Sequence, residues 1–281
     1  MNCKSLILLV AVAFGASMNA AEIAVVSTEK LEVEDAFHPT LSPNGNVVLF
    51  SGEAYQGLKS LNLVSNEIAI LDEGDGAGFN PIFSADGNEV VFRTVVKQDG
   101  LSRRDVKRYS LATGDAIQVE APSRGAVNTC AIVGSNYAYG FSNQQAIEVC
   151  IAGKAMTINP IENGYRYLWP SLSPSNDKLL FNETYSGLYV SNIDGSKAKH
   201  LATRADFPCW AGDKYVIAIY TEDDGYVITK ANVIAIDVES GNTITLTNDE
   251  QIVSGVSASK DKIIYSTENG EMYIMNIKIT E

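Results

Sequence analysis

The stretch HPTLSPNGNVVLF, residues 38–50, returns in modified form at two later places in the chain. It combines a short apolar segment, a tight turn and a second segment rich in β-branched and aromatic residues, a pattern that predicts a β-hairpin. Asn44 and Gly45 form the turn, because both residue types tolerate a positive φ. The later copies are FNPIFSADGNEVVF (residues 79–92) and LWPSLSPSNDKLLF (residues 168–181). The chain is therefore built of repeats, and the period of the repeats indicates its architecture.

A second turn marks each repeat, because every hairpin is followed by a strand, a Gly or Asn turn and another strand. The marker residues are separated by 48, 39, 42 and 46 residues, and they are Asn66, Gly114, Gly153, Gly195 and Gly241. This spacing is typical of four-stranded propeller blades. A helical fold is excluded, since no window sustains an apolar stripe with a period of 3.6 residues. The third copy (residues 128–158) lacks the proline and the turn motif at its start, and the fifth has a shortened turn at residues 211–213.

The sixth copy supplies three strands before the sequence ends, so its blade is one strand short. Residues 22–34, EIAVVSTEKLEVE, precede the first hairpin and have no partner of their own. We expect this segment to join the last blade as its outermost strand, since closure hides the exposed strand edge. The sequence thus predicts one all-β domain over residues 22–281, a six-bladed β-propeller of four-stranded blades whose ring is closed by the N-terminal strand.

Residues 1–21 have the features of a secretory signal peptide. Lys4 precedes an apolar run at residues 6–14, and small residues at 15–21 offer a cleavage site. Loss of this segment would change the formal charge from −13 to −14. An acidic surface of this kind repels nucleic acid and anionic lipid and suits a soluble secreted protein. We therefore expect export across the inner membrane to the periplasm, without membrane insertion after cleavage.

Three cysteines remain after removal of the signal segment: Cys130, Cys150 and Cys209. One disulfide with one free thiol is open, but we expect all three to be small buried apolar residues. The chain has no Cys-x-x-Cys pair, which argues against zinc. The acidic segments at residues 72–76 and 222–225 do not match a calcium-binding loop and are interpreted as solvated turns. We expect neither a metal nor a cofactor.

The repeat resembles a known family. Its proline, its S-P/A-[ND]-G turn, the following V-x-F strand and the segment LYVSNIDG (residues 188–195) are similar to the WD40-like Pro-Asp (PD40) repeat of TolB-type propellers. The resemblance covers nearly the whole chain after residue 21 and implies a propeller fold. It implies function less directly, because propellers of this type serve as periplasmic scaffolds, as domains attached to peptidases and as sugar-acid lyases.

The residues immediately before the repeated proline are the candidate binding site. We expect them at one mouth of the central channel. Four unlike side chains at equivalent positions indicate that this mouth is specialised for binding: His38, Asn80, Trp169 and Phe207. The alternative is that they only plug the channel. A second set occupies one strand register and is expected to pack between blades as core: Leu41, Phe83, Leu172 and Trp210.

Catalytic patterns are scarce in the sequence. The only histidines, His38 and His200, are far apart, and there is no G-x-S-x-G motif, so a catalytic triad cannot be assigned. Two histidines are also too few for the histidine-held metal of oligogalacturonate lyases. We therefore expect a non-catalytic, monomeric scaffold that binds a protein or peptide. The alternative is a carbohydrate-binding propeller or an oligogalacturonate-lyase-like enzyme, favoured by Trp169, Tyr165 and Tyr167. The insert at residues 95–106 is expected to be a flexible, exposed loop, and the alternative is a contact loop.

Overall fold

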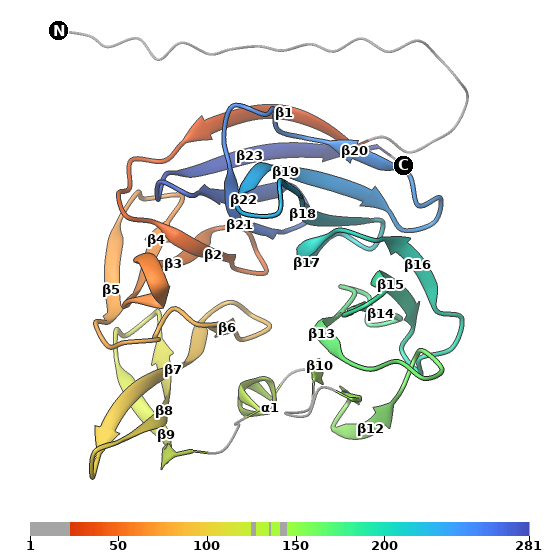
Figure 1. The fold of residues 1–281 in the computed structure, drawn as a ribbon. Coiled ribbons are helices and arrows are strands. Elements are labelled where there is room, and N and C mark those ends of the chain that lie inside the picture. Colours follow the sequence, from red (N-terminus) through yellow and green to blue (C-terminus); the bar gives the residue numbers. More distant parts are fainter. Residues whose placement is uncertain (1–22, 125–127, 135, 141–144, 281) are drawn as a thin grey trace, which may run out of the picture.

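The computed structural model describes residues 23–124, 128–134, 136–140 and 145–280. Its strands form six separate antiparallel sheets arranged as blades around a central channel, which confirms the six-bladed propeller (Figure 1). Blade one contains β2 (Phe37–Leu41), β3 (Val47–Ser51), β4 (Leu58–Asn62) and β5 (Ile68–Asp72). Blade two contains β6 (Ile82–Phe83), β7 (Glu89–Gln98), β8 (Leu101–Ser110) and β9 (Ala116–Ser123).

The second half of the ring repeats this order from the channel outward. Blade four contains β13 (Tyr167–Leu172), β14 (Lys178–Glu183), β15 (Gly187–Asn192) and β16 (Lys199–Ala202). Blade five contains β17 (Asp206–Ala211), β18 (Tyr215–Asp223), β19 (Ile228–Asp237) and β20 (Thr243–Thr245). Blade six contains β21 (Val253–Ala258), β22 (Lys262–Thr267) and β23 (Met272–Ile279).

The N-terminal strand closes the ring as predicted. Strand β1 (Ile23–Lys30) pairs antiparallel with β23, so the last sheet has the order β1-β23-β22-β21. Ile23 is buried at this seam, Asn276 donates a side-chain hydrogen bond to Ser27 (2.9 Å), and Lys30 forms an ion pair with Glu271 (2.5 Å). The edge of β23 is therefore covered by a strand from the opposite end of the described chain.

Blade three differs from the others. Its described sheet has three strands, β10 (Tyr137–Gly140), β11 (Ile147–Ile151) and β12 (Lys154–Ile158). A short helix, α1 (Thr129–Val133), lies between blade two and β10, in the part of the repeat where the other copies have their first strand (Figure 1). The helix begins at Asn128, whose side chain accepts a hydrogen bond from the Ala131 N–H, and it ends at Gly134 with φ of 79°. The degenerate start of the third repeat thus corresponds to a real change of structure.

The turn residues behave as the sequence indicates. Asn66 and the four glycines of the later turns all have positive φ, between 60° and 82°. Gly45 and Gly87 of the inner hairpins do so too, at 69° and 74°. The Asn44 side chain accepts hydrogen bonds from the Ser42 hydroxyl and the Asn46 N–H, which fixes the turn locally. These residues are therefore structural.

The hydrophobic core lies between neighbouring blades. Leu41 packs with Ile264 and Met272 of blade six, Phe83 with Leu49 of blade one, and Trp210 with Leu180 of blade four. Leu172 packs against the cluster shared by blades three and four. The prediction that these four positions are core residues is confirmed, and each joins its blade to the preceding one.

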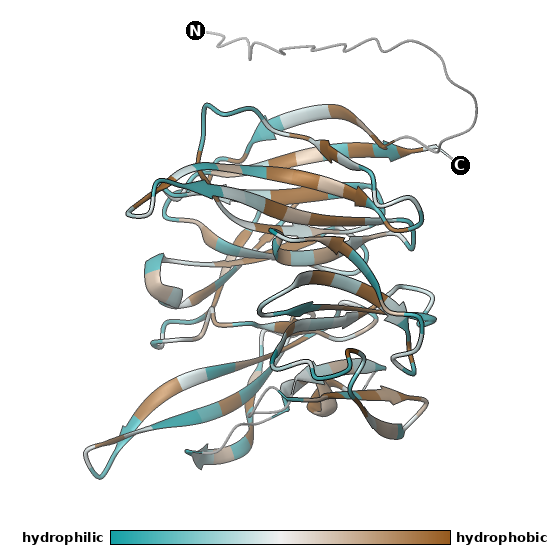
Figure 2. Ribbon diagram, turned by 45° about the vertical axis from the view of Figure 1, so that its right-hand side comes forward, coloured by the Kyte–Doolittle hydropathy of each residue, from teal (hydrophilic) through white to brown (hydrophobic). Residues whose placement is uncertain are grey.

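The insert at residues 95–106 is an extended hairpin and not a loop. Strands β7 and β8 remain paired up to Gln98 and Leu101, and the hairpin projects beyond the rest of the ring (Figure 2). Val95 and Leu101 are exposed on it. The insert is exposed as expected, but the expectation of a loop was wrong, because the β7–β8 pairing continues without interruption to its tip.

The predicted signal peptide at residues 1–21 lies outside the described residues. Within the described part of the chain, no helix is long and apolar enough to cross a membrane. The three described cysteines are free thiols, of which Cys150 is buried and Cys130 and Cys209 are partly exposed.

Candidate functional site

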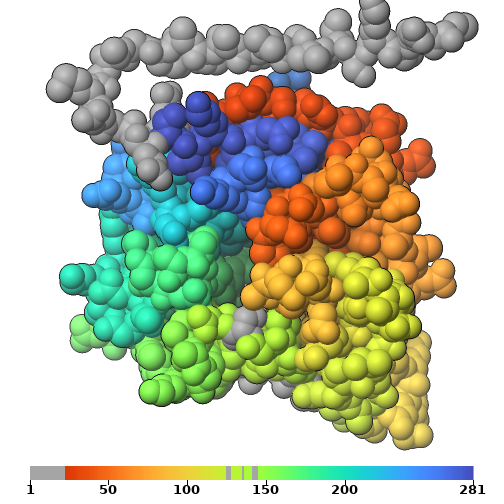
Figure 3. All heavy atoms as spheres, turned by 180° about the vertical axis from the view of Figure 1, so that it is seen from behind, coloured from red at the N-terminus to blue at the C-terminus, as the bar shows by residue number. Residues whose placement is uncertain are grey.

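The four residues before the repeated proline line one cavity. Its volume is about 1100 Å³, and it follows the central channel, since its walls include the pre-proline residues at one end and Pro43, Ala85 and Pro174 from the inner turns at the other. A hollow is visible near the centre of the face shown in Figure 3. We call the pre-proline end of the channel the aromatic mouth. The structure therefore brings together His38, Asn80, Trp169 and Phe207.

The backbone has the same unusual conformation at all four positions. The φ values of His38, Asn80, Trp169 and Phe207 lie between 50° and 53°, in the left-handed region that bulky side chains rarely adopt. In blades one, four and five the strand register shifts here, because two residues of the inner strand face one residue of its partner. A bulge of this kind redirects a side chain, and such strained positions gather at functional sites.

Two aromatic groups face each other across the mouth. On the side of blades one and two, His38 stacks on Tyr55 with ring centroids 3.9 Å apart, and Tyr55 meets the edge of Phe79 at 5.0 Å. On the side of blades four and five, Trp169 and Phe207 lie 5.3 Å apart. Phe79, Trp169 and Phe207 are 48%, 37% and 40% exposed, which is high for aromatic side chains of this size. These rings offer apolar contact area to a ligand.

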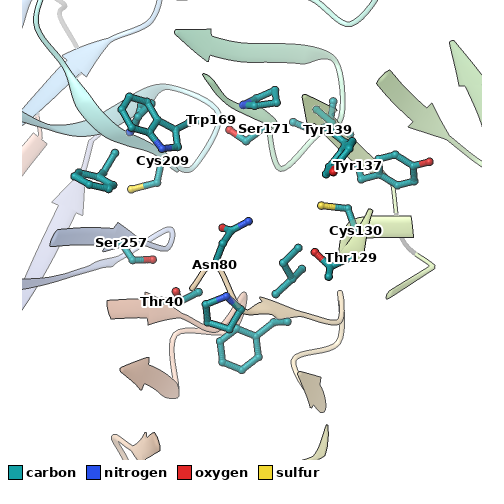
Figure 4. Close-up of a pocket in the computed structure, with 18 of the residues that line it drawn as sticks. Thr40, Asn80, Thr129, Cys130, Tyr137, Tyr139, Trp169, Ser171, Cys209 and Ser257 are labelled. Carbon is teal, nitrogen blue, oxygen red and sulfur yellow. The ribbon is translucent and has the colours of Figure 1, made fainter. Parts of the chain in front are cut away.

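Short polar side chains line the channel beyond the mouth. Four of them surround the cavity in Figure 4: Thr40, Ser171, Cys209 and Ser257. The first three directly follow the proline of their strand, and Ser257 occupies the equivalent position in blade six. The Asn80 amide points into the same space. The Ser171 Oγ is buried and has no hydrogen-bond partner among the described residues.

The helix and first strand of blade three form the remaining wall. Thr129 and Cys130 come from α1, and Tyr137 and Tyr139 come from β10 (Figure 4). Burial raises the pKa of the Cys130 thiol to about 11 and also raises the pKa of Tyr139, so both groups are neutral at pH 7. The Tyr137 hydroxyl donates to Glu148 at 2.8 Å. This wall is polar but uncharged.

The cavity has little charge for so acidic a protein. The described residues that line it include no Asp, Glu or Lys, and the only permanently charged side chain is Arg93. Burial lowers the pKa of His38, which is therefore neutral at pH 7. An acid-free cavity favours ligands that carry apolar groups or negative charge.

The two histidines lie apart, in different blades. His38 lies at the mouth, whereas His200 lies on the outer strand β16 and donates from Nε2 to the Ser186 carbonyl at 2.9 Å. No group of three or more His, Cys, Asp or Glu side chains that could hold a metal occurs in the described part of the chain. Asp72 of the first acidic segment is paired with Lys107 at 2.5 Å.

Tyr165 and Tyr167, the other two aromatic residues proposed for the carbohydrate alternative, are not exposed at the aromatic mouth as Trp169 is. Tyr167 is buried, with its ring edge-on to Phe181 and its hydroxyl donating to the Ile161 carbonyl. Tyr165 lies beside Tyr185 at 5.5 Å and does not line the cavity. Regular alternation would place residues 167 and 169 on the same face of the strand, but the bulge at residues 169–170 breaks this pattern and redirects Trp169.

Several cavity residues were not predicted from the sequence, above all Tyr55, Phe79 and Arg93. A signal for Arg93 exists in the repeats. The residue after the repeated strand phenylalanine is Ser51 in blade one and Asn182 in blade four, both buried, whereas blade two has the charged Arg93. Comparison of the copies at that position would have singled it out.

Comparisons with known proteins agree with this fold. No protein-family model matches the chain, and no curated protein matches it. TolB from Acinetobacter baumannii is similar with a TM-score of 0.57 at 13% identity, over 77% of this chain and 55% of that one. The chain thus spans about half the length of that TolB.

Two further solved structures are similar over more of their length. For a putative TolB from Agrobacterium tumefaciens the TM-score is 0.51 at 16% identity, over 88% of this chain and 91% of that one. For the β-propeller domain of Cps50 (Swd1) from Myceliophteria thermophila it is 0.54 at 10% identity, over 89% and 100%. At these identities the similarity shows the fold, and at that level it confirms the resemblance to TolB-type propellers.

Proposed function

We propose that this protein is a secreted, periplasmic, non-catalytic interaction module that binds a segment of a protein or a peptide at the aromatic mouth of its channel. The observation that carries the proposal is the cavity itself, about 1100 Å³ in volume and opening between two groups of aromatic side chains, of which Phe79, Trp169 and Phe207 are exposed. Ligand sites in proteins combine concave apolar walls with a few placed polar groups, and this channel has both. Export rests on the signal-like residues 1–21, and the protein acts as a monomer.

An extended peptide suits the shape of the cavity. The channel is long because it follows the inner strands from the mouth to the turns, and its short polar side chains can exchange hydrogen bonds with a peptide backbone. Trp169 and Phe207 would serve as the main apolar contacts, since large aromatic residues dominate binding energy at protein interfaces.

The test uses a synthetic library of 12-residue peptides screened against the protein. For a selected peptide, Trp169→Ala and Phe207→Ala should each weaken binding by roughly tenfold or more, while the Tm changes by only a few degrees because both rings are exposed. Tyr226→Ala removes a ring that is 96% exposed on another hairpin and should leave affinity unchanged. Peptides that bind all three variants equally would show that the mouth is not the site.

The alternative is a carbohydrate ligand, favoured by the tilted pair Trp169 and Phe207, which could stack on sugar rings. A glycan array and a turnover assay on oligogalacturonides separate the two proposals. Saturable glycan binding that depends on Trp169, or eliminative cleavage, would replace the peptide proposal.

A further inference from the structure

Arg93 lies where the aromatic mouth meets blade three. It belongs to β7, lines the cavity, and its guanidinium carbon is 5.2 Å from the centre of the Phe79 ring. Val95 is two residues beyond Arg93 and pairs with Arg104 in the ladder. Because residues two apart, and residues directly paired, lie on the same face of a sheet, the Arg93 and Arg104 side chains lie on the same face of the hairpin. Helix α1 packs against β7. The guanidinium is thus held in a partly closed corner beside an aromatic ring.

No carboxylate neutralises this guanidinium within the described part of the chain. The ion pairs of the same hairpin involve Lys107 with Asp72 and Arg108 with Glu89, and none involves Arg93. Burial lowers the pKa of Arg93, and the positive charge of Arg104 lowers it further. Cys130 and Tyr139 are close enough to interact with it electrostatically, but both are neutral at pH 7.

An unpaired, half-buried charge is costly in a folded protein. The chain has 34 acidic residues, so partners for an arginine are abundant, yet the described lining of this cavity contains none of them. At the equivalent positions, blades one and four have the neutral Ser51 and Asn182. Of these three equivalent positions, only the one in blade two carries a charge. Because no described carboxylate pairs with Arg93, a bound ligand can supply the negative charge.

We infer that the cavity recognises a carboxylate of the bound peptide through Arg93, with Phe79, Tyr55 and His38 contacting an apolar group next to that carboxylate. A guanidinium binds a carboxylate through two parallel hydrogen bonds, and such charge-assisted bonds are strong when partly shielded from water. The single cation in the wall fits a monoanion. This inference rests on the proposed function and adds the chemical requirement that the ligand must meet.

Two sources of the carboxylate are distinguished by the peptide library. Half of the 12-residue peptides carry a free C-terminus and half are amidated, and selected binders are resynthesised with Glu→Gln or Asp→Asn replacements. Loss of binding on amidation assigns the chain terminus, and loss on side-chain replacement assigns an acidic residue. We expect one of these changes to weaken binding by roughly tenfold or more.

The protein variants locate the contact. Arg93→Gln should weaken an acid-dependent peptide by roughly tenfold or more, and it should remove the preference for the acid over its neutral counterpart. Arg93→Lys should recover part of the affinity, because it retains the charge without the planar fork. Lys97→Gln removes the same charge from an exposed position of the same strand and should change affinity less than twofold.

The outcomes are separable. Peptides that depend on Trp169 but bind equally well as neutral analogues would overturn the carboxylate inference and leave the proposed function standing. Absence of any peptide that depends on Trp169 would overturn both. Displacement of the peptide by oligogalacturonate, with the same dependence on Arg93, would assign the carboxylate to a uronate and overturn the peptide assignment. If Arg93→Gln lowers the Tm, the neutral analogues measured on the unmodified protein still decide the question.

Discussion

At the scale of single residues, the pre-proline positions share a strained backbone conformation at the wall of the cavity. Asn80 and His38 are residue types that are enriched in the left-handed region, whereas Trp169 and Phe207 carry bulky rings that are easier to place in an extended strand. Their shared φ near 50° directs these rings toward the channel mouth. At Trp169 and Phe207 an unfavourable backbone conformation therefore coincides with an exposed aromatic side chain.

His38 should make stability dependent on pH. Burial lowers its pKa in the folded state below the ordinary value of 6.5, so the unfolded chain binds the proton more readily. The contribution of neutral His38 is present above pH 6.5 and is lost as the pH falls through the folded-state pKa. We expect the Tm of the unmodified protein to fall more between pH 7.5 and pH 5 than the Tm of His38→Asn, in which asparagine retains the left-handed backbone.

The matched control for this prediction is His200→Asn, since His200 lies on an outer strand. It makes the same change of residue type away from the cavity and is measured under the same conditions. Equal pH slopes for all three proteins would show that His38 does not titrate differently on folding.

The residue scale also shows what sequence can predict about a site. The repeated proline located His38, Asn80, Trp169 and Phe207 because equivalent positions in a propeller repeat converge on the axis. Tyr55 and Phe79 lie in connections between strands, where no periodic pattern constrains them. Such contacts depend on tertiary arrangement and are not visible in the sequence.

At the scale of elements, the β7–β8 hairpin should be dispensable for folding. Beyond Val95 its residues are mostly exposed, so its tip buries little apolar surface. Replacement of residues 97–102 by Asn-Gly, which favours a two-residue turn, should change the Tm by only a few degrees. Circular dichroism with thermal melting measures this.

A contrasting change is Trp210→Ala, which removes a ring that is only 8% exposed and packs on blade four. We expect a loss of about 3–5 kcal/mol in the free energy of unfolding. If shortening the hairpin were as damaging as this core substitution, the hairpin would have a structural role that its exposure does not reveal.

At the scale of the whole molecule, the blades are not joined equally. Hydrophobic clusters connect blades one and two, three and four, four and five, five and six, and six and one. Among the described residues no such cluster connects blades two and three. That junction instead uses polar contacts, such as the hydrogen bond that Arg108 donates to the Ile132 carbonyl of α1 at 2.7 Å.

The repeats in the sequence predicted the ring and its closure. They did not predict the junction of blades two and three, because it depends on helix α1, and the third copy has no motif that indicates a helix there.

This inequality predicts where the ring opens first. The junction of the chain ends in blade six is covered by β1 and backed by an apolar cluster, whereas the junction of blades two and three lacks one. Regions with few buried apolar contacts open at low free energy and exchange their amide hydrogens quickly. We expect the amides of α1 and β10 to exchange faster than those of β17, β21 and β22, by roughly tenfold or more, in hydrogen–deuterium exchange at pH 7.

A peptide whose carboxylate binds Arg93 would bridge this junction, so its addition should slow exchange in α1 and β10 while leaving β22 unchanged. Fastest exchange in β1 and β23 would instead place the weak point at the closure of the ring.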